Sequence, residues 1–445
     1  MNRADLDALS REQLIELVLG LAQQVAELRA KLDLPAKTPG NSSLPTSQGR
    51  KRGAGGGKRK GRRKGRPGVA RALDPSPTTV REVHAACCPH CRSELDVAAQ
   101  SPCERYDHIE LPEVSPAVTR VTLMGGTCPR CARAFKAAAP ADMPSGSPFG
   151  TNLRALALHL RFGQHIGLAR LAGLFRDVFG VRISQGGLVN LFRAAAAPFA
   201  AQAARLGDRL REGPVIASDE TGLRVAGGNA WLWVMQHGDS AVFRVDESRG
   251  KRVLADFLDG HRPDFWLSDR YGGQMGFATR GHQFCLAHLI RDAQYAIDAG
   301  DDGFAPGLLA LLKRACRIGA ARAELSDRQL ARYHRKFVRK LSELLQRPPT
   351  HREGEKLQRA IAKGRRNLFL FVTNRALEPT NNGSERALRP CATFRKVTGG
   401  FRTPWGASLY ADLRSVIETA RRRAIPPLQA IALTLTNAPL PLQTA

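Results

Sequence analysis

The sequence lacks an uninterrupted apolar run of about 18 residues, the length that a membrane-spanning helix needs. Its first residues, 1–7, lack the apolar core of a signal peptide. Acidic residues are scarce, because 40 Asp and Glu stand against 68 Lys and Arg and leave a formal net charge of +28. Such a surplus favours a polyanion or a membrane surface as partner over a small acidic substrate. Without a membrane segment, we expect a cytoplasmic protein whose partner is nucleic acid.

Cysteine is limited to nine residues, an odd number that disfavours a framework of disulfides. Four of them stand in two Cys-Pro-x-Cys runs, Cys88-Pro-His-Cys91 and Cys128-Pro-Arg-Cys131. Four thiolates complete the tetrahedral shell of a structural Zn²⁺. We therefore expect a small zinc-binding module at 80–140, unless the four thiols stay reduced and metal-free. Strand-like segments at 106–111 and 118–123 predict a hairpin between the two pairs.

The length of 445 residues, 43% of them hydrophobic, allows two to four domains with a sizeable core. Shifts in composition suggest where these domains begin and end. The predicted order is a coiled-coil helix at 1–34, a basic linker at 35–79, the cysteine module at 80–140, a helical domain at 151–211, an α/β domain at 212–400 with a basic helical insertion at 303–372, and a helical segment at 401–445.

Heptad spacing marks the N-terminal segment, residues 4–33. Leu14, Leu21 and Leu28 recur every seven residues, and Val18, Val25 and Leu32 recur in the complementary register. β-Branched residues at one core position and Leu at the other favour a parallel dimer. We expect a short coiled coil and hence a homodimer or higher oligomer; the alternative is a single helix packed on its own domain.

The linker that follows is rich in turn-forming and basic residues and cannot bury enough apolar surface to fold alone. Close to a polyanion its cations would bind phosphates without sequence preference; otherwise the tract is a solvated tail. The expected DNA-binding residues here are Lys51, Arg52, Lys58, Arg59, Lys60, Arg62, Arg63, Lys64 and Arg66.

Residues 151–211 carry Ala and Leu at helical spacing, with Gly180 as a helix stop and Ser184 as the next start. A second helix that ends near Arg193 would have the spacing of a helix-turn-helix. Two packed helices that lead into the next domain are the other interpretation.

Three carboxylates stand in positions that suit a metal site. Two apolar runs, at 214–218 and 264–268, each end in Ser-Asp before a Gly-containing turn, as buried strands do when they present a carboxylate at a sheet edge. Their acids are Asp219 and Asp269, and Glu385 follows near the start of a predicted helix that buries Leu388. Mg²⁺ (or Mn²⁺) prefers such oxygen ligands, and a pair of ions clamps the attacking and leaving oxygens of a phosphoryl transfer.

The α/β domain is expected to begin with three strands, formed by 215–219 with 223–225, by 231–235 and by 241–245. A helix at 249–258 and a strand at 265–268 follow, and a further strand at 282–284 leads into a helix with Cys285, His288 and Arg291 on one face. This helix is either half of a metal site or a core His beside a packed Cys.

Four ordered motifs resemble the DDE transposases of the insertion sequence 66 family. They are Asp219-Glu-Thr-Gly222, Ser268-Asp-Arg-Tyr271, Cys285-Leu-Ala-His288-Leu-Ile-Arg291 and Asn381-Asn-Gly-Ser-Glu-Arg-Ala-Leu-Arg-Pro390. The resemblance implies a ribonuclease H-like catalytic domain with a helical insertion, preceded by a leucine-zipper-like helix, a zinc-finger-like module and a helical DNA-binding-like domain. It also implies that Asp219, Asp269 and Glu385 hold two Mg²⁺, with His288 and Arg291 facing the scissile phosphate or the metal-bound groups.

Further basic residues surround the predicted site. Residues 303–372 contain 17 Lys or Arg and five Asp or Glu, so this insertion is either a DNA-facing wall or a solvated helical face. The paired glycines in 395–402 would let the backbone approach phosphates. Glu418 competes with Glu385 for its role, and Gln274 departs from the Tyr that is frequent in the family. Candidate DNA contacts are Arg386, Arg389, Arg395 and Lys396.

The resemblance implies a transposase that cuts double-stranded DNA at the ends of a bacterial insertion sequence and joins them to target DNA. Accessory proteins of the element are possible partners, and the bacterial nucleoid is the expected location. One alternative is a DNA-binding repressor of the element with a dead catalytic domain. The other is a nuclease or resolvase of the same fold that cuts without joining.

Overall fold

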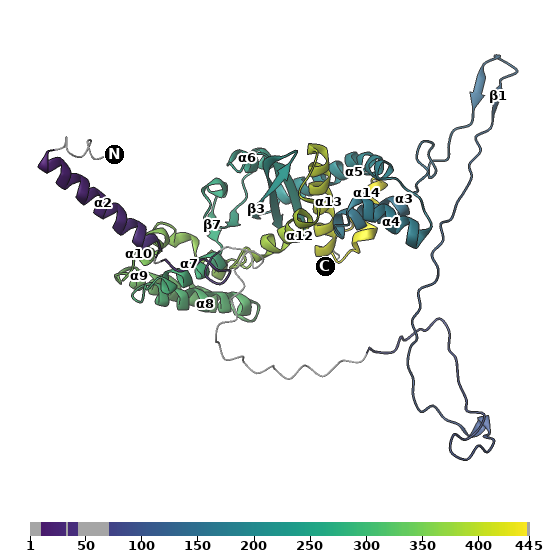
Figure 1. Ribbon diagram of the computed structural model, residues 1–445, viewed down its shortest axis with the longest axis horizontal. Helices are drawn as coiled ribbons and strands as arrows, with labels where there is room; N and C mark the ends of the chain where they lie inside the picture. Colours follow the sequence, from purple (N-terminus) through teal and green to yellow (C-terminus); the bar gives the residue numbers. More distant parts are fainter. Residues whose placement is uncertain (1–9, 33, 43–70, 443–445) are drawn as a thin grey trace. The chain divides into compact units, whose positions relative to one another are not determined.

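The computed structural model describes residues 10–32, 34–42 and 71–442 (Figure 1). The predicted DNA-binding residues between Lys51 and Arg66 lie outside the described residues. The chain divides into two compact units. One unit comprises Met1–Arg50, Thr119–Asp177 and Val181–Ala445, and the other comprises Lys51–Val118 and Val178–Gly180. No helix of the described part is long and apolar enough to cross a membrane.

A five-stranded mixed sheet forms the α/β part of the first unit, in the order β5-β4-β3-β6-β7. The first three strands form an antiparallel meander, and β6 and β7 continue the sheet parallel to β3. The turn between β3 and β4 is made by Ala226 and Gly227, both with positive φ, the geometry of a tight two-residue hairpin. The bounds are β3 (Val215–Val225), β4 (Gly228–His237), β5 (Ser240–Asp246), β6 (Phe265–Ser268) and β7 (Gly281–Phe284), with α6 (Arg252–Leu258) between β5 and β6.

The strand predictions hold except at β3. The segments 215–219 and 223–225 are one continuous strand, so Asp219 lies inside β3 and not at its end. The physical reason is that β4 pairs with β3 as far as Val225, whereas the pairing of β3 with β6 ends at Ala217. Asp219 therefore comes two residues after the last β6 partner while its backbone stays extended.

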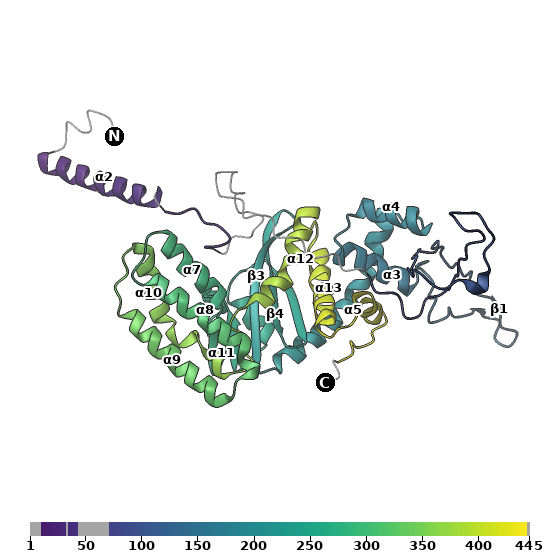
Figure 2. The same cartoon turned by 90° about the horizontal axis from the view of Figure 1, so that it is seen from below.

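Two long helices cover the β5 side of the sheet, α5 (Gln185–Arg211) and α13 (Pro404–Arg422) (Figure 2). Ser415 and Thr419 of α13 accept hydrogen bonds from the backbone N–H groups of Phe243 and Ala241, at 2.8 and 3.1 Å. Because β5 is an edge strand, its unpaired N–H groups could otherwise form hydrogen bonds with a strand of another chain. Helix α13 thus closes this edge of the sheet.

The helical region before the sheet consists of α3 (Thr151–Leu158), the π-helical turn η2 (His159–Gly163), α4 (Leu168–Phe179) and α5. Gly180 has a φ of 64°, and the Ser184 side chain caps α5 by accepting from Gly187 N, so the predicted stop and start are confirmed. The predicted helix end near Arg193 is wrong, because α5 continues to Arg211 and packs on α13 and β5. The alternative of helices that lead directly into the next domain fits this arrangement.

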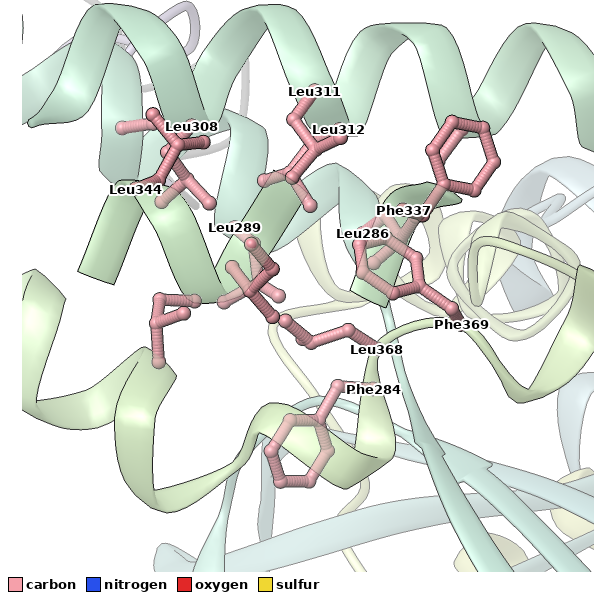
Figure 3. Packing of buried hydrophobic residues seen from close by; sticks show 14 of the residues in the cluster. Phe284, Leu286, Leu289, Leu308, Leu311, Leu312, Phe337, Leu344, Leu368 and Phe369 are labelled. Carbon is pink, nitrogen blue, oxygen red and sulfur yellow. The ribbon is translucent and has the colours of Figure 1, made fainter. Parts of the chain in front are cut away.

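The predicted helical insertion is present and is interrupted at Pro348-Pro349 as expected. It comprises α8 (Ala305–Ala321), α9 (Asp327–Leu345), α10 (Arg352–Lys363) and α11 (Leu370–Thr373), and it packs on α7 (Leu286–Asp298), which directly follows β7. One apolar cluster joins Leu286 and Leu289 of α7 to Leu308 and Leu312 of α8 and to Phe337 of α9 (Figure 3). The insertion therefore fixes the position of α7 beside the sheet.

The hairpin predicted for the cysteine module lies elsewhere than expected. Residues 106–111 and 118–123 contain no strand, whereas β1 (Gly125–Thr127) and β2 (Ala134–Lys136) form a hairpin around the second cysteine pair. Tyr106 and Val118 are exposed, so the alternation in these segments has no buried face against which strands could form.

The predicted N-terminal helix is α2 (Arg11–Leu32). Its apolar side chains Ile15, Val18, Leu21 and Val25 are each about half exposed, so this face is left largely uncovered by the described residues. An unpaired heptad face is what a coiled coil requires of each helix. The dimer itself stays a prediction.

Candidate active site

Asp219 and Asp269 lie at the same level of two neighbouring parallel strands. The pairing of β3 with β6 ends at Ala217 and Leu267, and each Asp follows two residues later. Asp219 Oδ1 accepts the backbone N–H of Glu220 at 2.9 Å, and Asp269 Oδ1 accepts that of Tyr271 at 2.9 Å. Each carboxylate is held by one oxygen, which leaves the other oxygen for a ligand.

The electrostatics of Asp219 show that the acids converge. Burial raises the pKa of Asp219 well above its usual range, and the negative charges of Glu220, Asp269 and Glu385 raise it further. Like charges close together disfavour one another's ionisation, so in the absence of a cation the Asp219 carboxyl keeps its proton to a higher pH than an ordinary aspartate does. A divalent cation between these carboxylates reverses the effect, because it stabilises their ionised forms.

Helix α12 (Asn382–Thr398) carries Glu385 in its first turn and buries Leu388, as predicted. The helix is longer than the short one expected, because it continues through Pro390. Its N-cap residue, Asn381, makes no side-chain capping bond. Asn381 Nδ2 instead donates to the carbonyl of Ser218 at 2.7 Å, and Asn381 N donates to Cys285 Sγ at 3.1 Å.

The buried side chain of Asn381 thus ties the start of α12 to the residue before Asp219. Its Oδ1 accepts from Ser384 Oγ at 2.7 Å, and Gln236 of β4 donates to the same hydroxyl at 3.1 Å. Because these bonds are buried, their geometry is fixed. They bring a helix whose N-cap residue lies 162 residues after Asp219 (381 − 219) against the middle of β3.

His288 and Arg291 of α7 both face Glu385. His288 Nε2 lies 3.7 Å and Arg291 Nη2 3.4 Å from Glu385 Oε1. Cys285 Sγ joins them, since the ligand atoms of Cys285, His288 and Glu385 lie within 4.8 Å of one another. The prediction that 285, 288 and 291 share one face is therefore confirmed, and that face points at the third acid.

The cysteine of this trio is buried and packed. Burial raises the pKa of Cys285 to about 11, so the group is a neutral thiol near pH 7. A neutral thiol is a poor metal ligand, whereas as an acceptor for Asn381 N it helps to place α12. His288 is partly exposed beside Glu385, which differs from a core histidine.

Glu220 is a fourth acid. It belongs to the motif Asp219-Glu-Thr-Gly222, but no role was predicted for it. Burial raises the pKa of Glu220, opposed by the hydrogen bond from Arg249. Gln274 Nε2 also donates to Glu220 Oε2, at 2.5 Å, and its Oε1 accepts from Ser218 Oγ at 2.5 Å. Gln274 is therefore a buried link between β3 and the loop after Asp269. The Asp219-Glu220 dipeptide was the only available signal for this role.

The predicted DNA contacts on α12 differ in their surroundings. Arg386, Arg389 and Lys396 are exposed, whereas the Arg395 guanidinium donates to the carbonyl of Gly222 in β3. Arg395 therefore has a structural contact that the sequence did not indicate.

Of the paired glycines, Gly400 does not lie open to a phosphate, whereas Gly399 is exposed and forms the left-handed C-cap of α12. Phe401 N donates to Arg224 O at 2.9 Å, and Ala226 N donates to Phe401 O at 2.8 Å. A Cβ on Gly400 would lie 2.7 Å from Arg224 O, and its φ is 112°. Gly400 is needed for this close approach to the end of β3.

Glu418 does not compete with Glu385. It is buried on α13 and forms ion pairs with Arg421 at 2.5 Å and Arg422 at 3.2 Å. Although burial acts to raise the pKa of Glu418, the hydrogen bond from Arg421 and the charge of Arg422 lower it. A carboxylate whose oxygens are occupied by arginines has a structural role.

The two cysteine pairs adopt the same local turn. Arg92 N donates to Cys88 O at 2.8 Å, and Ala132 N donates to Cys128 O at 2.8 Å. The residue after the second Cys has positive φ in both, 61° at Arg92 and 53° at Ala132. Non-glycine residues adopt this conformation uncommonly, so its occurrence at the same place in both turns indicates that the two turns are related in structure.

Hydrogen bonding favours thiolates in both turns. Bonds from Ser93 lower the pKa of Cys91 to about 7, and backbone bonds from Cys131 and Arg130 lower the pKa of Cys128. The first pair belongs to the second compact unit and the second pair to the first. Binding of one ion by all four thiolates stays a prediction.

Comparison with known proteins gives one finding. A family model described as "Transposase IS66 family" matches residues 146–409. The matched stretch contains Asp219, Asp269 and Glu385 together with His288 and Arg291, and it begins after both cysteine pairs. No curated protein matches the chain.

Proposed function

The chain belongs to the Transposase IS66 family, and on that premise we propose that it cuts DNA at the ends of an insertion sequence and joins them to target DNA. The observation that carries the proposal is the convergence of acids on Asp219, whose pKa responds to Asp269, Glu220 and Glu385. Carboxylate oxygens are hard ligands, and such a cluster suits a divalent cation such as Mg²⁺ best.

Asp219, Asp269 and Glu385 would hold two Mg²⁺ (or Mn²⁺). Bound there, the ions would neutralise phosphate charge and lower the pKa of water. Water then displaces the 3′-oxygen at the element end, and the freed 3′-hydroxyl attacks a target phosphodiester and displaces its 3′-oxygen in turn. Arg291 and His288 orient Glu385 and face the reacting phosphate, so positioning and charge neutralisation carry the reaction without a covalent intermediate.

We propose that this α/β domain has a ribonuclease H-like fold, which would suit this chemistry. The three-stranded meander β3-β4-β5, extended beyond β3 by the parallel strands β6 and β7, has the strand order of that fold. Its acids belong on the first and fourth strands and on a late helix. Asp219, Asp269 and Glu385 stand there, with the helical insertion between the second and the third.

A DNA substrate fits the distribution of exposed positive charge. Among the described residues, the insertion carries exposed cations without an ion-pair partner, and α12 adds more beside Glu385. Such surfaces bind the phosphate backbone of DNA. The residues are Lys313, Arg314, Arg317, Arg328, Arg332, Arg335, Lys336, Arg386 and Arg389.

The decisive experiment measures cleavage and joining of DNA that carries the element's own ends, with Mg²⁺ or Mn²⁺. We expect Glu385→Gln to lose metal-dependent nicking, by about 100-fold or more, because a third charged ligand is removed. The matched control is Glu378→Gln, an exposed acid whose ion pair within the described part of the chain is with Arg322, and it should leave the rate unchanged.

Each alternative predicts a different outcome of the same assay. A repressor with a dead catalytic domain binds the ends and never nicks them, even when the element's accessory proteins are added. A nuclease or resolvase nicks without joining. Equal nicking by wild type and Glu385→Gln would remove Glu385 from the metal site.

We also propose that the two cysteine turns hold a structural Zn²⁺. Purified wild type is expected to contain about one zinc per chain by elemental analysis, since four thiolates saturate a tetrahedral ion. Cys91→Ser should lose this zinc, whereas Cys103→Ser, which changes an exposed cysteine outside both turns, should keep it. Zinc-free wild type, or a Cys91→Ser variant that retains zinc, would refute the module.

A further inference from the structure

Arg249, in the loop between β5 and α6, is held on three sides. Its guanidinium carbon lies 4.7 Å from the ring centroid of Trp231 and 4.2 Å from that of Tyr271. Arg249 Nη2 lies 2.7 Å and Nε 2.8 Å from Glu220 Oε1. Two aromatic rings and the Glu220 carboxylate therefore contact the guanidinium, and these contacts hold the side chain before any ligand arrives.

The remaining edge is free and faces solvent. The Arg249 side chain is 43% exposed, whereas that of its partner Glu220 is 1% exposed. Among the described residues, Nη1 has no hydrogen-bond partner. An arginine that only neutralised a buried acid would have no need of an exposed donor edge, and a planar donor edge matches the oxygens of a phosphate.

The partners of Arg249 are neighbours of both predicted metal-binding aspartates. Glu220 follows Asp219 in β3, and Tyr271 donates its backbone N–H to Asp269 Oδ1. The Tyr271 hydroxyl also donates to Arg249 O at 3.2 Å, which closes the contact. Arg249 is thus linked to Asp219 through its ion pair with Glu220, and to Asp269 through its contact with the Tyr271 ring.

We propose that Arg249 binds a phosphate of the DNA strand that enters the active site, with Trp231, Tyr271 and Glu220 as its rigid holder. This inference rests on the proposed function, because it assumes a DNA substrate at these acids. Rigidity matters because an arginine that is already ordered loses little conformational freedom when it binds. The contacted phosphate would be the scissile one or a near neighbour, given the links to Asp219 and Asp269.

The test combines protein and DNA changes in the full-length chain. Binding of end-bearing DNA is measured in Ca²⁺, and cleavage in Mg²⁺, for wild type, Arg249→Gln and Arg249→Lys. The DNA carries a single uncharged methylphosphonate at each position in turn around the cleavage site. A matched control is Arg244→Gln, a partly exposed arginine on the neighbouring strand β5 whose ion pair with Asp256 is long, at 4.0 Å.

We expect Arg249→Gln to weaken DNA binding roughly 10-fold to 100-fold, as loss of one charged hydrogen bond does. The slope of the logarithm of the binding constant against the logarithm of salt concentration should fall by about one, the value for one lost phosphate contact. At one position, the methylphosphonate should weaken DNA binding by wild type but not by Arg249→Gln. Arg249→Lys should keep the charge and recover only part of the binding. Arg244→Gln should respond to every methylphosphonate as wild type does.

A purely structural role for Arg249 gives a different pattern. The variant would then lose thermal stability, and its sensitivity to each methylphosphonate would match that of wild type. That result, or unchanged binding and cleavage, overturns the proposal. If wild type binds the ends without cutting them, the proposed function fails while the phosphate contact is still decided by binding in Ca²⁺.

Discussion

Asp219→Asn is expected to lower the rate of strand cleavage by about 1000-fold or more, while DNA binding changes by less than about threefold. The negative charges of Glu220, Asp269 and Glu385 all act on this carboxylate. It therefore stands where the attraction for a bound cation is expected to be strongest. Removal of one fixed electrostatic contact at a reacting phosphate typically costs 100- to 1000-fold. Binding is spared because the exposed cations that contact the DNA backbone lie on other elements.

The same substitution is expected to stabilise the metal-free protein. In the unfolded chain Asp219 ionises with its ordinary pKa, whereas in the folded protein it keeps its proton to a higher pH. The folded state therefore binds more protons above the ordinary pKa, so the contribution of Asp219 to the free energy of unfolding falls as pH rises. Asn carries no charge and removes this penalty. A gain of about 1 kcal/mol would raise Tm by about 2–4 °C.

Cleavage assays with Mg²⁺ and thermal scans in a chelator at pH 5 and pH 8 measure both effects. The Tm gain should be larger at pH 8. Asp264→Asn is the control, because Asp264 precedes the other end of strand β6 and its carboxylate is partly exposed beside Arg280. If Asp219→Asn cleaves at the wild-type rate, the metal site is elsewhere; if it lowers Tm at pH 8, the burial argument is wrong.

The positions of the three acids were predictable because local sequence marks them, whereas their joint role as metal ligands stays a prediction. An apolar run followed by Ser-Asp indicates a strand that presents a carboxylate, and this pattern located both Asp219 and Asp269. Glu385 was found from its place at a helix start. The motif resemblance then ordered the three into one site, and the pairing of β3 with β6 and the coupling of Asp219 to Glu385 agree with that order.

The contacts that hold the acids were not predictable, because they join residues far apart in the chain. Nothing around Gln274 indicates that it bridges Ser218 and Glu220, and nothing near Arg249 indicates that two rings enclose it. The errors share a second cause, which is that local patterns do not reveal burial. Strands were expected at 106–111, where the side chains are mostly exposed, and Gly400 was expected to approach a phosphate, whereas it lies against Arg224 at the end of β3.

Asn381→Ala is expected to be the most disruptive change outside the acids, with cleavage reduced about 100-fold and the free energy of unfolding lowered by about 2–4 kcal/mol. Asn381 is 1% exposed and links Ser218, Ser384 and Cys285. Alanine leaves the Ser218 carbonyl without its buried donor, at a cost of about 1–3 kcal/mol, and removes further bonds. A displacement of α12 by about 1 Å would misplace Glu385, which typically costs about 100-fold.

Urea unfolding followed by tryptophan fluorescence measures the stability of this region, because Trp233 and Trp266 are buried in the sheet. The matched control is Asn382→Ala, since Asn382 is the next residue along but is exposed, and it should keep both rate and stability. Weakened positioning of Glu385 should also raise the Mg²⁺ concentration for half-maximal cleavage, an effect that lost stability alone would not produce below the unfolding temperature. Asn381→Ala with a wild-type Mg²⁺ requirement and rate would show that Glu385 is held by α7, through Arg291 and His288, and not by the start of its own helix.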